Sequence, residues 1–396
     1  MPVANTIAEQ MSRGSWVRRM FEEGAEIKRQ RGAENVFDYS IGNPDVEPPA
    51  RVLEALRKTV AANRPGSHGY MPNAGYPQVR ESIAARLVRE TGLPFTANDI
   101  VMTTGAAGAC NVILKAILDP GDEVIVLLPY FPEYAFYISN HGGTMVPVQT
   151  DDEFLPDLGR IAAAITPRTR AIMLNTPNNP TGRIYPEGVL RGLNEVLARA
   201  SHPIVVLSDE PYKTLVYDGR RQPEVASSIT NTAICYSWSK SQGLPGERIG
   251  YLALSPRMAD LQALRDACVF TNRVLGYVNA PAIWQWVALE AGDEMIDISA
   301  YQQKRDMLCT ALEQIGYDVR RPEGTFYIFL KTPIPDDVAF VRTLAREGVL
   351  AVPGTGFGRG GYLRLSLTIP KIQIERSIPG FERAFRAVKA AAGTGA

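Results

Sequence analysis

Short apolar runs alternate with amphipathic stretches through the middle of the chain. The runs at 124–128, 171–174 and 203–208 are almost entirely aliphatic, which is typical of strands buried on both faces. Between the last two runs, the segment 186–200 has apolar residues at helical spacing. Buried strands that alternate with helices predict an α/β fold with a mostly parallel sheet, whose ligand groups gather at the carboxyl ends of the strands.

Further elements extend this pattern in both directions. We expect strands at 100–104, 233–236 and 249–254, and helices at 16–30, 52–63, 78–91, 105–118, 256–270, 281–291 and 294–315. Beyond these, runs at 324–330, 349–354 and 362–366 flank a helix at 336–347 and predict a smaller α+β section. The segment 12–15 is small and polar, and it either covers a pocket or simply caps the helix that follows.

Length and composition exclude several function classes. A chain of 396 residues exceeds the size of one ordinary core, and its 42 basic and 42 acidic residues leave no net charge to attract nucleic acid or an anionic membrane. The 4 cysteines and 3 histidines do not cluster, so we expect neither disulfides nor a metal site. With no signal peptide and no apolar run near the roughly 20 residues of a membrane span, we expect a cytoplasmic protein.

Two ionisable side chains stand where burial would be costly. Asp209 ends an apolar strand, and a carboxylate there needs a cation. Lys240 lies between two apolar runs, and an amine that is desolvated beside another cation, such as Arg248, can form a Schiff base with a carbonyl. The hydroxyl of Ser237 and the guanidinium of Arg248 suit an anion. The stretch therefore predicts a site for a cofactor with a carbonyl and a phosphate, although a polar loop between two strands is the simpler alternative.

Other strand ends add to this site. The small residues 105–109 open a helix, whose free N–H groups can bind a phosphate or whose small side chains can pack tightly on the sheet. Phe131 follows a buried run and could stack on a flat ring or fill the core. Arg364 lies in an alternating strand pattern, where it needs an anion if it faces inward and none if it points to solvent.

These residues belong to motifs that occur in a fixed order. The motifs are Asn179-Pro180-Thr181-Gly182, Asp209-x-x-Tyr212, Ser237-x-x-Lys240 with Arg248, and Arg364 near the end. Together they closely resemble the class I/II aminotransferases of fold type I, the aspartate aminotransferase family, which depend on pyridoxal phosphate. The resemblance runs from Gly42 to Arg364. It implies a large domain at 46–285, with a mostly parallel sheet of the seven-stranded type sandwiched by helices, and a smaller α+β domain from 1–45 and 286–396.

The resemblance also implies a role for each residue. Lys240 would form the Schiff base and move the substrate's proton, Asp209 would hold the ring nitrogen protonated, and Tyr212 and Asn179 would bind the ring's phenolic oxygen. Phe131 would stack on the ring. The phosphate would be bound by Ser237, Arg248, the backbone at Ala106 and Ala107, and Tyr70 from a partner subunit. The substrate's α-carboxylate would be bound by Gly42, Asn179 and Arg364.

The implied activity is transfer of an amino group from an L-amino acid, such as aspartate or glutamate, to a 2-oxo acid such as 2-oxoglutarate, in a homodimer with shared active sites. Family members that take dicarboxylates use an arginine from the partner or a lysine in the loop that here reads Gly105-Ala106-Ala107. Arg273 lies in roughly the region of that arginine, and Arg13 is a weaker substitute, so acidic, neutral and aromatic substrates stay open.

Two other functions compete with this interpretation. A β- or γ-eliminating lyase, or a synthase, would keep the cofactor and change the reaction. A ligand-sensing regulator on the same fold would need an additional DNA-binding domain, and the residues before Gly42 are too few and lack a basic helix-turn-helix.

Overall fold

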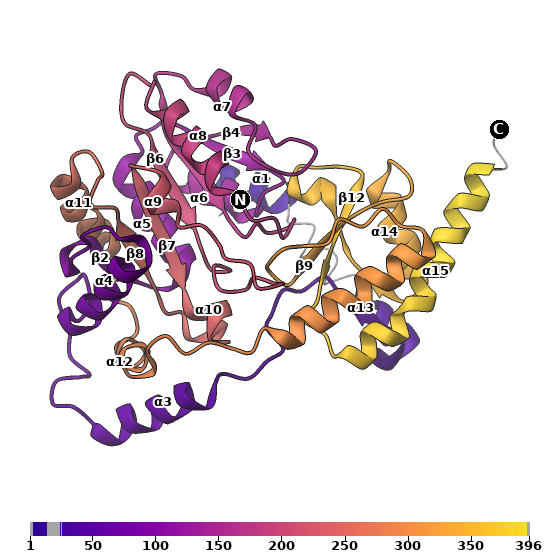
Figure 1. The fold of residues 1–396 in the computed structure, drawn as a ribbon, viewed down its shortest axis with the longest axis horizontal. Helices are drawn as coiled ribbons and strands as arrows, with labels where there is room; N and C mark the ends of the chain where they lie inside the picture. Colours follow the sequence, from indigo (N-terminus) through magenta and orange to yellow (C-terminus); the bar gives the residue numbers. More distant parts are fainter. Residues whose placement is uncertain (1–2, 14–23, 25, 394–396) are drawn as a thin grey trace.

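Seven strands form the central sheet of the protein, in the order β2-β8-β7-β6-β5-β3-β4. The structure is a computed structural model that describes residues 3–13, 24 and 26–393 (Figure 1). In sheet order the strands are β2 (Ile100–Thr103), β8 (Gly250–Leu254), β7 (Thr232–Ser237), β6 (Val205–Asp209), β5 (Thr169–Asn175), β3 (Glu123–Leu128) and β4 (Thr144–Gln149). The strands from β7 to β4 are parallel, whereas β8 is antiparallel to both neighbours, which confirms the mostly parallel sheet.

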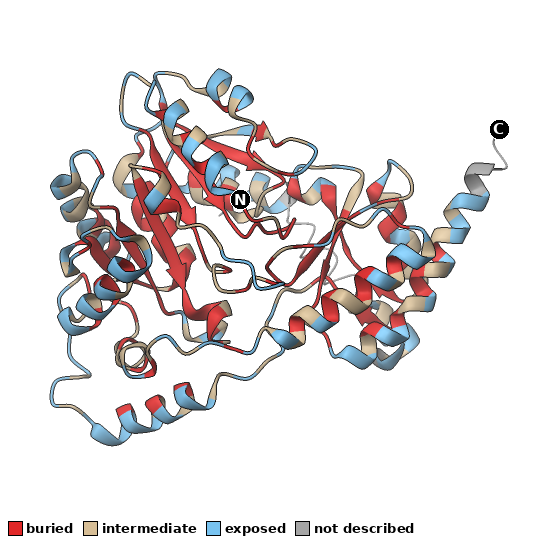
Figure 2. Cartoon of the chain, in the orientation of Figure 1, coloured by how far each residue is buried: buried red, intermediate tan, exposed pale blue. Residues whose placement is uncertain are grey.

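Helices cover both faces of this sheet because successive strand residues point to opposite sides. Val124 and Val126 pack against one set of helices, and Ile125 and Leu127 against the other. The first face carries α5 (Gly105–Ile117), α6 (Glu133–Asn140) and α11 (Leu261–Val274). The second face carries α3 (Ala50–Ala62), α4 (Pro77–Thr91), α7 (Leu158–Ala164), α8 (Glu187–Leu197), α9 (Val225–Ser228) and α12 (Ala282–Ala291). Figure 2 shows the strands buried and the outer helix faces exposed.

A smaller sheet lies beside the first one, toward the C-terminal helices (Figure 1). Its antiparallel strands are β11 (Val352–Pro353), β12 (Tyr362–Ser366) and β9 (Tyr327–Lys331). A separate core joins it to α13 (Ser299–Ile315), α14 (Asp337–Arg346) and α15 (Lys371–Gly393). Near the other end of the chain, β1 (Phe37–Asp38) pairs with β10 (Val349–Leu350), so residues from both ends of the sequence meet in this part.

Several predicted elements differ from those observed. The helix expected at 256–270 is α11, which begins at Leu261 and includes Arg273 in its last turn. The helix expected at 294–315 begins only at Ser299. The edge strand β4 was not predicted, because Pro147 and several exposed residues interrupt its apolar pattern, and an edge position tolerates both.

The division into two domains stays a prediction. Its boundary at 285–286 falls inside α12, whose buried Val287 and Ala291 share a core with Val52 of α3. Half of the expected 12–15 cover, residues 14 and 15, and much of the expected 16–30 helix lie outside the described residues, whereas Ser12 and Arg13 end helix α1 (Asn5–Arg13). In the parts of the chain that the structure describes, no helix is both long and apolar enough to cross a membrane.

Candidate active site

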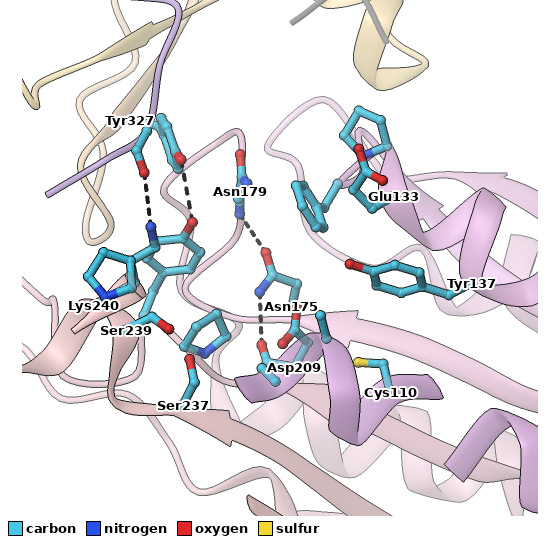
Figure 3. A pocket seen from close by; sticks show the side chains of 18 of the residues that line it. Cys110, Glu133, Tyr137, Asn175, Asn179, Asp209, Ser237, Ser239, Lys240 and Tyr327 are labelled. Carbon is cyan, nitrogen blue, oxygen red and sulfur yellow. Dashed lines mark hydrogen bonds between the residues drawn. The ribbon is translucent and has the colours of Figure 1, made fainter. Parts of the chain in front are cut away.

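A cavity of about 390 Å³ opens where β5, β6 and β7 end (Figure 3). Asn175, Asp209 and Ser237 are the last residues of these strands, and all line it. The smaller sheet closes the opposite wall with Tyr327 of β9 and Arg364 of β12. The cavity brings together eleven predicted site residues, namely Gly42, Ala106, Ala107, Phe131, Asn179, Asp209, Tyr212, Ser237, Lys240, Arg248 and Arg364.

Lys240 reaches the cavity from the short helix α10 (Trp238–Ser241), which follows β7 directly. Its Nζ donates a hydrogen bond of 2.9 Å to the backbone oxygen of Gly42. Burial, together with the positive charges of Arg364 and Arg248, lowers the pKa of Lys240 from 10.5 to about 8. About a tenth of the amine is therefore uncharged at pH 7, far more than for an ordinary lysine, and this fraction can act as a nucleophile.

Asp209 is held rigidly at the end of β6. The hydroxyl of Tyr134 donates to its Oδ2 over 2.5 Å, and the amide of Asn175 donates to its backbone oxygen over 2.8 Å. Its Oδ1 is buried and has no hydrogen-bond partner within the described residues. Burial raises the pKa of Asp209 from 3.8 to about 6, and the Tyr134 hydrogen bond opposes this shift. The carboxylate is thus incomplete without a further donor.

Arg364 faces inward, so the alternative in which it points to solvent is wrong. It is 3% exposed, and its Nη1 and Nη2 donate to Oδ1 of Asn179 and to the backbone oxygen of Ser40, over 3.2 and 2.9 Å. Its Nε is buried without a partner among the described residues. The backbone N–H of Asn179 donates in turn to Oδ1 of Asn175 over 2.6 Å. These bonds hold a guanidinium ready for an anion at the cavity wall.

Two tyrosines, Tyr212 and Tyr327, line the cavity together with Lys240 and Arg364. The hydroxyl of Tyr212 donates to that of Tyr327 over 3.4 Å, and burial raises the pKa of Tyr212 well above its ordinary value. A Cβ at Gly42 would lie 1.8 Å from the Tyr327 hydroxyl oxygen. Gly42 therefore has to be glycine for the backbone to come this close.

The start of α5 forms the floor of the cavity. Gly105 has a φ of +77°, and a Cβ there would lie 3.1 Å from Nη2 of Arg248. The first turn leaves the N–H groups near Ala106 and Ala107 without helical partners. Arg248 lies beside them, with a hydrogen bond of 3.4 Å to the backbone oxygen of Thr104. A helix N-terminus next to an arginine is suited to a phosphate.

Two predicted residues do not line this cavity. Tyr70 is 94% exposed in the loop before α4. Arg273 is exposed at the end of α11, with its guanidinium carbon 5.4 Å from the ring centre of Phe270. The sequence assigned both to the active site of a partner subunit, and that assignment stays a prediction.

Several residues of the site were not indicated by the sequence. Tyr134, Asn175 and Tyr327 hold or adjoin predicted residues, and Glu133 and Tyr137 of α6 line the cavity as well. The segment Pro129 to Tyr134 carried a weak signal, because it follows a buried strand as Asp209 does. Nothing in the sequence indicated that the hydroxyl of Tyr134 would meet a residue so distant along the chain.

Comparisons with known proteins agree on one group. The family model described as aminotransferase class I and II matches residues 34–378. An aspartate/prephenate aminotransferase of Thermus thermophilus is similar, with 36% identity over 90% of this chain and 92% of that protein. An amino transferase structure from Eubacterium rectale covers 98% of this chain and 99% of its own, with 36% identity and a TM-score of 0.94. The Thermus thermophilus aspartate aminotransferase with maleate has 31% identity and a TM-score of 0.85, covering 97% of this chain and 100% of its own.

Proposed function

Because the chain belongs to the class I and II aminotransferases, which depend on pyridoxal phosphate, we propose that it transfers an amino group from an L-amino acid to a 2-oxo acid. The reaction is of the ping-pong type, and Lys240, Asp209 and Tyr212 are its catalytic residues. One observation carries the residue roles. A lysine of lowered pKa and a buried, half-satisfied aspartate line the same cavity, where two sheets meet. The comparisons give no support to a lyase or synthase.

The residues present fit pyridoxal phosphate. The unpartnered Oδ1 of Asp209 would accept a hydrogen bond from a protonated ring nitrogen. Phe131 would cover the ring, and Tyr212 and Asn179 would bind its phenolic oxygen. The phosphate would be bound by Ser237, Arg248 and the backbone N–H groups near Ala106 and Ala107.

When bound, pyridoxal phosphate supplies an aldehyde that condenses with amines and a ring that withdraws electrons from the substrate's Cα. The amine of Lys240 would bind the aldehyde and, once released, take the proton from Cα. Asp209, with a pKa of about 6, is mostly ionised at neutral pH and would hold a proton at the ring nitrogen. Tyr134 would keep the carboxylate in place through its hydrogen bond of 2.5 Å.

Arg364 would bind the substrate's α-carboxylate. Its guanidinium is already fixed by Asn179 and Ser40, so little conformational entropy is lost when the anion arrives. The close approach of Gly42 to Tyr327 and the hydrogen bond of Lys240 to the Gly42 backbone place the amine beside this arginine. An L-amino acid held by its carboxylate would therefore present Cα to Lys240.

A second subunit would complete the site. Tyr70 is almost fully exposed, and Val60, Phe270 and Val274 are exposed apolar side chains on nearby elements of the chain. In a homodimer, Tyr70 of the partner subunit would reach the phosphate, and Arg273 of the partner subunit would lie near the substrate's side chain. We place this enzyme in the cytoplasm with small-molecule substrates.

A spectroscopic half-reaction tests the proposal. Protein loaded with pyridoxal phosphate is mixed with one amino acid at a time, with aspartate and glutamate included, and the cofactor absorbance is followed. We expect conversion to the amine form of the cofactor, reversal by a 2-oxo acid, and parallel lines in double-reciprocal plots. Release of ammonia or pyruvate without any acceptor would instead indicate a lyase, and no conversion with any common amino acid would contradict transamination.

A further inference from the structure

One charged side chain in the cavity has no role in the proposed reaction. The charged residues that line the cavity are Glu133, Asp209, Lys240, Arg248 and Arg364. Four of them serve the cofactor or the α-carboxylate in the function proposed above. Glu133 serves neither. Figure 3 shows Lys240 on one side of the cavity and Glu133 with Tyr137 on the opposite side, with Asn179 and Asp209 between them.

Glu133 is the first residue of α6, and this position orients it. Pro132 precedes the helix, so the chain turns immediately after Phe131. Tyr137 follows Glu133 by one helical turn, so both side chains lie on the same face of α6 and line the cavity. Between them, Tyr134 points to Asp209. The helix that supports Asp209 through Tyr134 therefore also presents a carboxylate to the substrate space.

Among the residues that the structure describes, no group satisfies the Glu133 carboxylate. Within the described residues, Glu133 forms neither a salt bridge nor a hydrogen bond through its side chain. Burial raises the pKa of Glu133, and no cation in the described part of the chain lowers it. The arginines that line the cavity bind other groups, because Arg364 donates to Asn179 and Ser40 and Arg248 donates to the backbone oxygens of Pro245 and Thr104.

We propose that Glu133 determines substrate specificity by favouring amino acids whose side chain ends in a cation, an ammonium or guanidinium group, and by disfavouring dicarboxylates. A cationic side chain would supply the partner that the protein leaves out, whereas a second carboxylate would meet a like charge in a partly desolvated space. This inference rests on the proposed function, because it requires the α-carboxylate to be held at Arg364 with the side chain extending away from it.

The test compares substrates of matched length in the wild type and in Glu133→Gln. For the wild type we expect kcat/KM for L-lysine to exceed that for its neutral counterpart L-norleucine, and L-glutamate to be poorer than L-glutamine. In E133Q we expect the lysine-to-norleucine ratio to fall about tenfold and the glutamate-to-glutamine ratio to rise by a similar factor, as the loss of one half-buried charge pair predicts.

Glu187→Gln is the matched control, since Glu187 is also the first residue of a helix that follows a proline, but it is exposed and pairs with Arg191. It should leave both ratios unchanged. If E133Q also leaves them unchanged, the proposal is wrong. Arg273→Gln tests the alternative in which a protein side chain, and not the substrate, pairs with Glu133. If Glu133 is paired with Arg273 of the partner subunit, the wild type will show no preference for lysine, and R273Q will create one, which would overturn the proposal.

Binding without turnover separates this inference from the proposed function. The α-methyl forms of lysine, norleucine and glutamate lack the hydrogen that Lys240 would remove, so their dissociation constants can be measured from the cofactor absorbance. We expect α-methyl-lysine to bind most tightly in the wild type and to lose this advantage in E133Q. Equal affinities for all three would contradict the role of Glu133. Failure of every ordinary amino acid to transfer its amino group would contradict the proposed aminotransferase function. The dissociation constants of the α-methyl compounds would still test the role of Glu133.

Discussion

The two sides of the cavity differ in how completely one chain builds them. On the side of Lys240 and Asp209, neighbours within the chain hold both residues. The amine of Lys240 donates to the Gly42 backbone, Tyr134 donates to the Asp209 carboxylate, and Asn175 donates to the Asp209 backbone oxygen. On the side of Glu133, the carboxylate has no partner within the described residues, and Tyr70 and Arg273 lie outside this cavity. The reacting groups are thus preorganised, whereas the side that meets the substrate's side chain is left for another molecule to complete.

This difference has a physical reason. Groups that act on every substrate gain from a fixed geometry, because any freedom they keep must be lost in each catalytic cycle. Groups that select one side chain gain from an unsatisfied charge, because only the matching substrate removes the cost of that charge. Changes on the Lys240 side should therefore reduce turnover with all substrates, and changes on the Glu133 side should reorder them.

The largest effect is expected from Lys240→Ala. The variant loses both the amine that binds the cofactor and the base that takes the proton, so kcat should fall by at least about 10⁴-fold with every amino acid. Steady-state rates in protein saturated with pyridoxal phosphate measure this, with the exposed Lys115→Ala as control. A loss restricted to some amino acids would mean that Lys240 acts in specificity and would remove the contrast between the two sides.

Asp209→Asn should reduce activity and stabilise the apoprotein. In the wild type, burial raises the pKa of Asp209 from 3.8 to about 6, so the folded protein holds the proton of this carboxyl group more tightly than the unfolded chain does. The free energy of unfolding therefore falls as the pH rises from about 4 to 6, and above pH 6 the whole cost is present, about 3 kcal/mol for a shift of about two pKa units.

Thermal unfolding of the apoprotein at pH 7 and pH 4 checks this prediction. The gain from D209N should be present at pH 7 and absent at pH 4, while kcat/KM of the loaded enzyme at pH 7 falls by about 10²-fold or more. If the variant were equally destabilised at both pH values, Asp209 would be a structural residue rather than a strained, functional one.

Tyr134→Phe should have an intermediate effect. The variant removes the hydroxyl that donates to Asp209, a bond to a charged group worth about 2 kcal/mol, so kcat/KM should fall about tenfold to thirtyfold. Because this hydrogen bond lowers the pKa of Asp209, the acidic limb of the rate profile should also move to higher pH. Tyr130→Phe, at a tyrosine that does not line the cavity, is the control. An unchanged pH profile would show that Tyr134 only fills space.

The smallest expected effect is a pH dependence of cofactor binding. Lys240 has a pKa lowered to about 8, so its uncharged fraction rises most steeply between pH 7 and 9. The rate at which apoprotein incorporates pyridoxal phosphate should rise about tenfold from pH 6 to 7 and level off above pH 9. Stopped-flow absorbance measures it. A midpoint near 10.5 would mean that burial and the nearby arginines do not act on this amine.

The sequence by itself determined the central sheet and most of the reacting groups. Runs such as 124–128 and 203–208 are apolar on both faces, as is typical of strands covered by helices on both sides of a sheet. The carboxyl ends of parallel strands in such a sheet lie at the same edge. Charges at buried strand ends predicted only a cofactor with a carbonyl and a phosphate. The ordered motifs around Asn179, Asp209, Lys240 and Arg364 named pyridoxal phosphate through their resemblance to the class I/II aminotransferases.

Tertiary structure alone decided the contacts between residues that are distant in the sequence. Tyr134 meets Asp209, Gly42 meets Tyr327, and Glu133 enters the cavity because α6 packs beside α5. Edge strand β4 and the true start of α11 also depended on packing, since local pattern is weak where residues are half exposed. Apolar periodicity specifies which face of an element is buried, but which side chains meet across that face depends on how the elements are placed in space.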